Sequence, residues 1–186
     1  RVAVADMHRD GFGENLVTGE DVSDKDITAF RLNLGAYVTD DFNLQFALDH
    51  MDDTSGVRGA KMLAPNRFAP GMLPLDDRYD VRNGMPNIND TDMLGVSATA
   101  NYRMNDDWSF KYVWAKRESD TETNIDFDTL QNKIADVKAF YSDEQVTNEL
   151  QVNYDAGGRS RGVVGLYFFD GWAGGQVLNN FFNASF

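Results

Sequence analysis

The sequence predicts an all-β protein, with about seven or eight antiparallel strands forming a segment of a transmembrane β-barrel. Three observations support this fold class. Apolar and polar residues alternate along several stretches, which is the period of a strand with two different faces. Large aromatic residues stand near the ends of the apolar faces, as at the edges of a lipid-facing band. Short and long connections alternate, which is typical of barrels with short periplasmic turns and long extracellular loops.

The clearest strand signal is the hairpin at residues 94–116. Its first arm has one apolar face, made of Leu94, Val96, Ala98, Ala100, Tyr102 and Met104. Its second arm has an aromatic face, made of Trp108, Phe110, Tyr112 and Trp114. The polar residues 105–107 between the arms favour a tight turn. Each arm runs for about 10 residues, the length that a membrane-spanning strand requires.

The other expected strands follow the same alternation along the chain. They cover residues 1–9, 27–38, 42–48, 146–155 and 161–169, the last with apolar residues on both faces and therefore an open register. Short turns are expected near 39–41, 105–107 and 156–160, and long loops near 11–26, 51–92, 118–145 and 170–186. Within the third loop, Leu130, Ile134 and Val137 fit a short helical turn, while residues 134–141 fit a strand equally well.

Composition limits the classes of function. The chain has 186 residues, enough for one domain over 1–186, and its 17 basic against 30 acidic residues give a net charge of −13. This charge argues against a nucleic-acid partner, which needs clustered cations. Cysteine is absent, and no apolar run approaches the ~18 residues of a transmembrane helix. A mean hydropathy of −0.47 is compatible with barrel strands, since only alternate residues face lipid.

About seven strands are fewer than the even number, eight or more, that closes a single-chain bacterial barrel. An open sheet in lipid leaves unsatisfied backbone groups at both edges. Either the last loop therefore hides one more strand, or the chain is a piece of a larger barrel.

Three stretches carry a resemblance to a known family. They are QNKIADVKAFYSDEQVTNELQVNYDAGGRSRGVVGLYFFDG at 131–171, RDGFGENLVTGEDVSDKD at 9–26 and VRGAK at 57–61. These segments resemble barrel strands of TonB-dependent outer-membrane receptors of the iron-complex type, over residues 1 to about 181. The resemblance implies an early third of a 22-stranded barrel, with the plug, the TonB box and the C-terminal barrel strands absent from this chain.

The resemblance also implies a location and partners. The location is the outer membrane of a Gram-negative bacterium. The partners are outer-membrane lipid and lipopolysaccharide, the TonB complex through the missing plug region, and a small nutrient ligand such as a ferric siderophore, imported with energy relayed through TonB. No cofactor, no metal and no catalytic residue is expected. The alternatives are a small porin or adhesion barrel and, from another class, a surface hydrolase on a barrel.

Candidate site residues fall into three groups. Cations and an aromatic of the long loop are candidates for capturing an anionic chelate or a sugar: Arg58, Lys61, Arg67, Arg78 and Tyr79. Polar residues of the strands are expected to face the barrel lumen and contact a plug: Arg31, Asn33, Gln45, Arg103, Lys111, Glu149 and Gln151. Aromatic residues are expected in the lipid girdle: Phe42, Trp108, Trp114 and Tyr154.

For two further groups of residues, a structural explanation is favoured over a functional one. His50 with Asp49, Asp52 and Asp53 resembles a catalytic constellation, but a strand end entering a polar loop explains it, and no G-x-S-x-G motif accompanies it. The acid clusters at residues 24–26, 76–80 and 90–92 lack the spacing of a calcium loop and fit solvated loops better. Acidic loops that bridge to lipopolysaccharide through divalent cations are a hypothesis that EDTA treatment tests.

Overall fold

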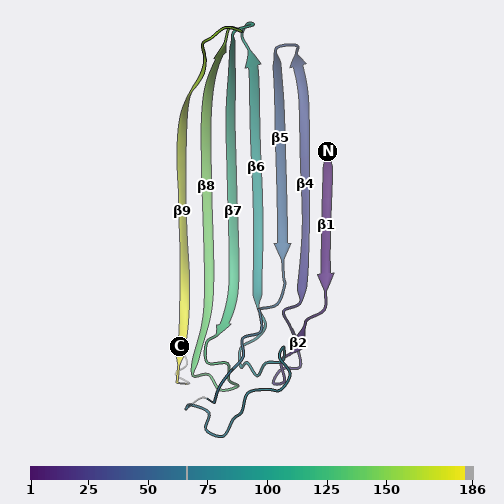
Figure 1. Cartoon of the computed structure of the whole chain (residues 1–186), viewed down its shortest axis with the longest axis vertical. Helices are drawn as coiled ribbons and strands as arrows, with labels where there is room; N and C mark the ends of the chain where they lie inside the picture. The colour runs from purple at the N-terminus through teal and green to yellow at the C-terminus, as the bar shows by residue number, and fades with distance from the viewer. Residues whose placement is uncertain (66, 183–186) are drawn as a thin grey trace.

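The computed structural model describes residues 1–65 and 67–182, and this part of the chain contains strands and loops but no helix. Seven strands form one antiparallel sheet in the order β1-β4-β5-β6-β7-β8-β9, and β2 and β3 form a small separate ladder (Figure 1). The all-β, antiparallel fold predicted from the sequence is therefore confirmed. The strands are β1 (Val2–Arg9), β2 (Gly13–Glu14), β3 (Asp21–Val22), β4 (Lys25–Thr39), β5 (Phe42–Asp53), β6 (Asn89–Arg103), β7 (Trp108–Asp126), β8 (Ala135–Asp155) and β9 (Arg161–Phe181).

From β4 to β9, each strand pairs with the next along the chain, so the connections alternate between the two ends of the sheet. The turns after β4, β6 and β8 lie at one end, and the longer connections lie at the other (Figure 1). Local hydrogen bonds explain the tight turns. In the β6–β7 turn, the Asn105 carboxamide oxygen accepts from the backbone N–H groups of Asp107 and Trp108, both at 2.9 Å. The three predicted short turns are confirmed.

The predictions for two long loops were wrong, because the strands extend beyond the stretches in which apolar and polar residues alternate clearly. The third long loop, expected at 118–145, is only residues 127–134, since β7 continues to Asp126 and β8 begins at Ala135. The β7 extension is polar on both faces except at Ile125, whereas the β8 extension has apolar residues on one face at Ala135, Val137 and Ala139. Cross-strand polar pairs hold the two extensions together. Ser119 donates to Asp143 at 2.8 Å, and Lys138 Nζ lies 2.6 Å from Glu122 Oε1. The strand alternative for residues 134–141 is the one that the structure adopts.

The fourth long loop, expected at 170–186, was also wrong. β9 continues through this glycine-rich stretch to Phe181 and pairs with β8 along its whole length, while residues 183–186 lie outside the described part. The pairing also fixes the open register of β9. Leu166 lies opposite Leu150, and Tyr167 lies opposite Glu149. Pairing with a long neighbour, and not the alternation of β9 itself, therefore determines where this strand ends.

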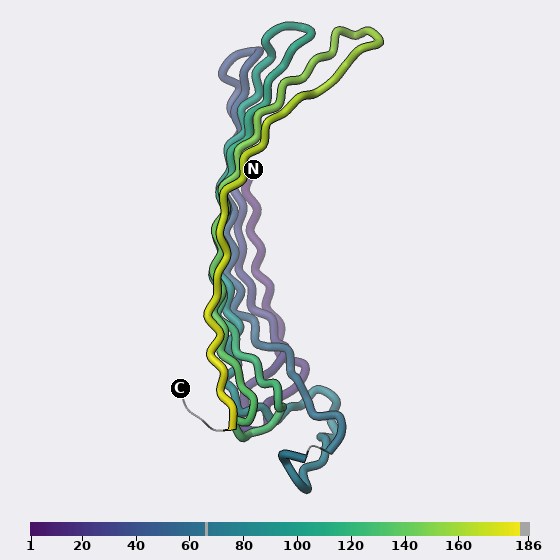
Figure 2. The backbone as a smooth tube through the Cα atoms, turned by 90° about the vertical axis from the view of Figure 1, so that its left-hand side faces the viewer, coloured from purple at the N-terminus to yellow at the C-terminus, as the bar shows by residue number. Residues whose placement is uncertain are grey.

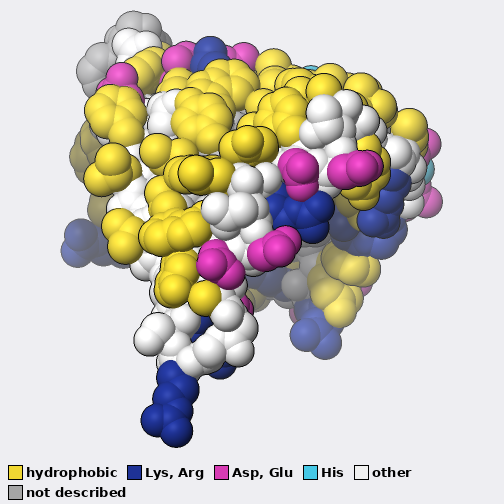
Figure 3. Space-filling model, turned by 90° about the horizontal axis from the view of Figure 1, so that it is seen from above, with side chains coloured by type: hydrophobic (Ala, Val, Ile, Leu, Met, Phe, Trp, Pro, Cys, Tyr) yellow, Lys and Arg dark blue, Asp and Glu magenta, His cyan; other side chains and the backbone are white. Residues whose placement is uncertain are grey.

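The sheet has an apolar face and a polar face, which we define by the register. One row of the apolar face contains Leu34, Phe46, Ala98, Trp114, Asn148 and Phe168, in which Asn148 is the polar exception. The polar face carries the residues between them, except that β9 also has apolar residues on this face, at Val163, Tyr167 and Phe169. Many apolar side chains are exposed, including Leu34 (55%) and Leu166 (75%), because the described part of the chain has no second layer over this face. Viewed from above, hydrophobic side chains form a large continuous patch (Figure 3).

The apolar face changes character along the strands. From the row of Trp108 and Tyr154 to that of Trp114, the face is dominated by apolar and aromatic side chains. In the next row Lys116 appears, and its Nζ lies 3.0 Å from Glu118 Oε2 and 3.4 Å from Glu144 Oε2. Beyond it, one row contains four aspartates, Asp6, Asp52, Asp92 and Asp120. The apolar band is thus bounded by aromatic residues at the turn end and by charges toward the loop end.

The long connections fold together at one end of the sheet. Figure 2 shows the sheet from the side, bowed along its length, with these connections gathered on one side at the end opposite the short turns. Val22, Val81 and Leu130, one from each of the three connections, are at most 2% exposed. The backbone of Val81 bonds to Glu14 and Leu16 at 3.0 Å, which joins the first connection to the second. The main buried core of the described chain lies here, above the polar face.

Candidate functional site

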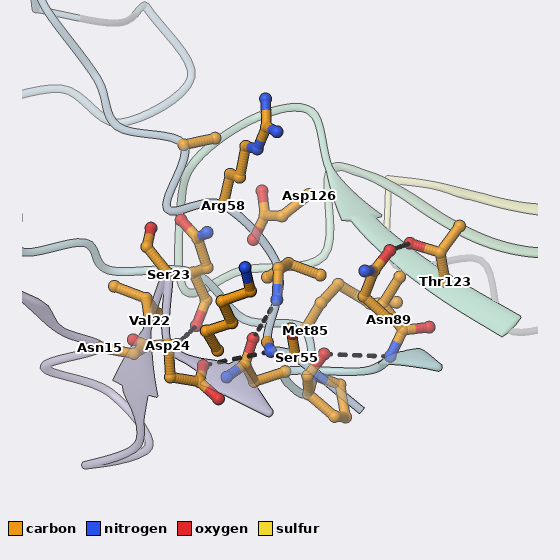
Figure 4. Close-up of a pocket in the computed structure, with 18 of the residues that line it drawn as sticks. Asn15, Val22, Ser23, Asp24, Ser55, Arg58, Met85, Asn89, Thr123 and Asp126 are labelled. Carbon is orange, nitrogen blue, oxygen red and sulfur yellow. Dashed lines mark hydrogen bonds between the residues drawn. The ribbon is translucent and has the colours of Figure 1, made fainter. Parts of the chain in front are cut away.

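A cavity of about 890 Å³ lies between the polar face of the strand ends and the folded connections (Figure 4). Its floor includes the strand residues Ile27, Asp53 and Thr123, and its walls include Val22 and Arg58 from the connections. The volume falls in the usual range for small-molecule sites, about 300–1,000 Å³. The cavity is therefore the candidate ligand site of the described part of the chain.

A stack of alternating cations and aromatic rings extends from this cavity. The Arg9 guanidinium lies 3.9 Å from the centre of the Phe12 ring, and the Phe12 and Tyr79 rings are 5.9 Å apart. The Arg78 guanidinium lies 5.0 Å from the centre of the Tyr79 ring. Arg9 also donates to the Ser23 carbonyl at 2.8 Å, which fixes the inner end of the stack. Aromatic surface next to cationic groups suits a flat, anionic ligand.

Polar side chains of the cavity wall are positioned by bonds to backbone groups. Asp24 accepts from the Gly56 N–H at 3.1 Å, and Asn87 accepts from the Val57 N–H at 2.7 Å. The first bond holds the second connection against the first, and the second bond lies within the second connection. Burial raises the pKa of the Asp126 carboxyl, which also lines the cavity, above its usual range.

Among the described residues, the cavity cations Lys25 and Arg58 have no carboxylate within 4.0 Å. Arg58 is exposed and Lys25 is half-buried. Figure 4 shows Arg58 among the residues around the cavity. The two cations are thus available to an anionic ligand.

The five predicted ligand residues do not all meet. Arg58 and Tyr79 line the cavity, and Arg78 contacts it through Tyr79. Lys61 donates to the carbonyls of Leu75 and Asp77 and so braces the second connection. Arg67 stacks on Phe68, with 4.8 Å between the guanidinium and the ring centre.

Arg9 and Phe12 belong to the site but were missed by sequence reasoning. They lie at the end of β1 and in a polar loop, and only the contact with Tyr79, far along the chain, brings them into the site. No local sequence signal identifies such a contact.

The seven residues predicted to face a lumen all lie on the polar face. The strand register places on this face Arg31, Asn33, Gln45, Arg103, Lys111, Glu149 and Gln151. Arg103 pairs with Asp41 at 2.7 Å, and Gln151 donates to Glu149 at 2.6 Å. Most of the face is therefore polar over the length of the apolar band behind it.

The four predicted girdle residues all lie on the apolar face. The Trp108 and Tyr154 rings are 4.8 Å apart at the turn end, and Phe42 lies 6.5 Å from Tyr102 in the adjoining row. Trp114 lies in the row just before that of Lys116, which is the first charged row. The aromatic residues thus mark both limits of the apolar band.

His50 pairs with a different aspartate from those expected. Its Nε2 lies 2.9 Å from Asp92 Oδ2, and its ring stacks on Phe30 with 5.9 Å between centres. Asp49, the neighbour in sequence, points to the other face and pairs with Arg117 at 2.6 Å. Strand alternation therefore separates the side chains that the sequence places side by side.

Several acids of the predicted clusters serve the local backbone. Asp77 Oδ1 accepts from the Tyr79 N–H at 2.7 Å, and Asp80 Oδ1 accepts from the Glu14 N–H at 3.0 Å. These bonds shape the second connection beside the cavity. Asp90 is exposed at the start of β6.

Comparison of the chain with protein families, with curated proteins and with solved structures found no match. In the described residues, no helix has the length and hydropathy needed to cross a membrane.

Proposed function

We propose that this sheet is a segment of the barrel wall of an outer-membrane TonB-dependent receptor, which imports a scarce nutrient such as a ferric siderophore. The cavity and its cation–aromatic stack form part of the ligand site in this proposal. The polar face lines the lumen and contacts a plug, and the apolar face contacts lipid.

The observation that carries the proposal is the bounded apolar band on an otherwise polar chain. From the row of Trp108 to that of Lys116 is eight residues, or about 27 Å along a strand. A strand tilt of ~40° reduces this to roughly 21 Å, comparable with the ~25 Å band of outer-membrane barrels. Aromatic residues at the turn end and charges beyond the far limit correspond to the two membrane interfaces.

The edges of the sheet support a larger barrel. β1 and β9 are the edge strands of the described sheet, and β9 presents 21 residues to one side without a partner strand. Unpaired backbone groups in lipid cost several kcal/mol each, so both edges need neighbouring strands. In the proposed receptor, the remaining strands of the barrel supply them.

The ligand class follows from the chemistry of the cavity. Asp24, Asp53 and Asp126 line the cavity together with Arg9, Lys25 and Arg58, but the three cations form no ion pair among the described residues. Phe12 and Tyr79 supply flat aromatic surface. An anionic chelate with aromatic rings, as in many ferric siderophores, matches both features.

A matched pair of substitutions tests the membrane orientation. Leu150 lies on the apolar face near the middle of the band, and Gln151 is its neighbour on the polar face. We expect Leu150→Arg to lower the free energy of unfolding in lipid vesicles by ~2–4 kcal/mol, the cost of a cation near the bilayer midplane. Gln151→Arg should cost under about 1 kcal/mol. Equal costs in full-length protein would contradict the orientation.

Uptake of a labelled ferric chelate tests the transport role. A deletion strain complemented with the full-length gene is compared with strains carrying Arg58→Gln in the cavity or Arg159→Gln in the β8–β9 turn at the opposite end. We expect Arg58→Gln to weaken chelate binding at least tenfold and Arg159→Gln to leave it unchanged. Uptake should stop when TonB is deleted. Uptake that persists without TonB would support the passive porin alternative.

A further inference from the structure

Three aspartates at the loop end of β7 and β8 converge beside the cavity, and Asp126 alone of the three lines it. Asp126 ends β7, Asp136 is its cross-strand partner in β8, and Asp128 lies in the connection between them. One carboxylate oxygen from each lies within 4.8 Å of the other two. Two oxygens bound to one Ca²⁺ at about 2.4 Å are at most about 5 Å apart, so the spacing fits a single ion.

Backbone donors hold two of these carboxylates in place. Asp126 accepts one N–H on each oxygen, from Thr129 at 2.7 Å and from Gly84 at 2.9 Å. Asp128 accepts three N–H groups, from Leu130, Ile134 and Ala135, at 2.6–2.9 Å. Each carboxylate oxygen has two acceptor positions, so both oxygens of Asp126 and one of Asp128 retain capacity for a further partner.

Asp136 has no such partners. Its side chain is 1% exposed, and neither of its carboxylate oxygens accepts a hydrogen bond. In the described part of the chain, no lysine, arginine or histidine nitrogen lies within 4.0 Å of any of the three carboxylates. Buried charges normally have a partner of opposite charge in direct contact, and the charge of Lys133 reaches Asp136 only from beyond ion-pair distance.

Other unpartnered buried atoms near the cluster are also acceptor oxygens. They are the carboxamide oxygens of Asn83, Asn124 and Asn180. Asn180 lies directly opposite Asp136 in the β8–β9 ladder, and Asn124 precedes Asp126 by two residues on the same strand face. Asn83 adjoins Gly84, whose N–H binds Asp126. The surplus at this end of the sheet consists of oxygen acceptors, with no nitrogen or sulfur ligand among them.

We propose that Asp126, Asp128 and Asp136 bind a calcium ion. Carboxylate and carbonyl oxygens are the ligands of hard divalent cations, and Ca²⁺ accepts six to eight of them in flexible geometry. Mg²⁺ demands a tighter octahedron and retains several waters, so a cage built largely from protein oxygens favours Ca²⁺. The ion places positive charge in direct contact with the three buried carboxylates.

The site has a structural consequence. Asp126 and Asp136 belong to the strands, Asp128 belongs to the third connection, and Gly84 links the second connection to Asp126. A bound ion therefore fastens two connections to the end of the sheet. Asp126 also lines the cavity, whereas Asp128 and Asp136 do not, so the ion site adjoins the proposed ligand site through Asp126. The ion site does not depend on the transport role.

Calorimetric titration with CaCl₂ tests the proposal on full-length protein in detergent, stripped of metal with EDTA. We expect one saturable site with a Kd of about 10⁻⁴ M or tighter, and binding of MgCl₂ at least tenfold weaker. Asp136→Asn should raise the Kd for Ca²⁺ at least tenfold. The matched control is Asp90→Asn, which removes an equal charge from an exposed position on β6. It should leave the Kd unchanged.

Limited proteolysis supplies a readout that does not require the variant. Ca²⁺ should slow cleavage of wild-type protein within residues 127–134 at least tenfold, and EDTA should restore it. If Asp136→Asn fails to fold, Asp126→Asn takes its place in the titration. The proposal is overturned by the absence of saturable Ca²⁺ binding in wild-type protein. An unchanged Kd in the folded variant, or an equal loss in Asp90→Asn, also overturns it.

Discussion

At the residue scale, Gly95 shows how a missing side chain allows an ion pair to form across a strand. Asp49 on β5 and Arg117 on β7 flank Gly95 in one row of the polar face, and their side chains meet over it at 2.6 Å. A Cβ at position 95 would lie 2.8 Å from Asp49 Oδ2 and 2.9 Å from Arg117 Nη2. A Cβ at this position would therefore displace the ends of both side chains from the ion pair.

We expect Gly95→Ala to lower the free energy of unfolding by about 1 kcal/mol, since the displaced pair is partly exposed and such pairs contribute at most about that much. The control is Gly35→Ala on the same face, where a Cβ would meet only the Leu44 carbonyl at 4.0 Å. Chemical unfolding in micelles measures both. In an Arg117→Gln background, Gly95→Ala should lose its effect, and an undiminished cost there would contradict this explanation.

At the element scale, alternation predicted each long strand of the sheet but not its full length. The apolar face of β7 ends near Trp114, yet the strand continues to Asp126 because polar residues pair with polar residues of β8. The period of two depends on a contrast between faces, and that contrast disappears where both faces are polar. The cavity residues Arg9 and Phe12 and the aspartates 126, 128 and 136 were missed for a related reason. Long-range pairing brings them together, and their spacing matches no local motif.

The apolar face also makes a prediction at this scale, because all three tryptophans lie on it. Trp108 and Trp114 lie within the band, and Trp172 lies in the row of Glu118 and Glu144 beyond it. In single-tryptophan variants in vesicles, brominated lipid should quench Trp108 and Trp114 more strongly than Trp172. Aqueous iodide should show the reverse order. Strong iodide quenching of Trp108 would contradict its place in the lipid girdle.

At the scale of the whole molecule, the two ends of the sheet are stabilised differently. The turn half has apolar side chains exposed on one face, and its proposed stabilisation comes from lipid. The loop end has its own core, in which Val22, Val81 and Leu130 are buried by three connections that are far apart in sequence. The connections therefore behave as one packed unit above the cavity, and a defect in one should loosen the others.

Val81→Asp tests this coupling, because it places a charge at a side chain that is 1% exposed. We expect hydrogen exchange to accelerate at least tenfold in residues 11–24 and 127–134 as well as around residue 81, since an unpaired buried charge disrupts the shared core. The part of the sheet between the row of Trp108 and the row of Lys116 should remain protected from hydrogen exchange. The control is Leu73→Asp in the same connection, at a leucine that is 67% exposed. Faster exchange confined to the neighbourhood of residue 81 would show that the connections fold independently.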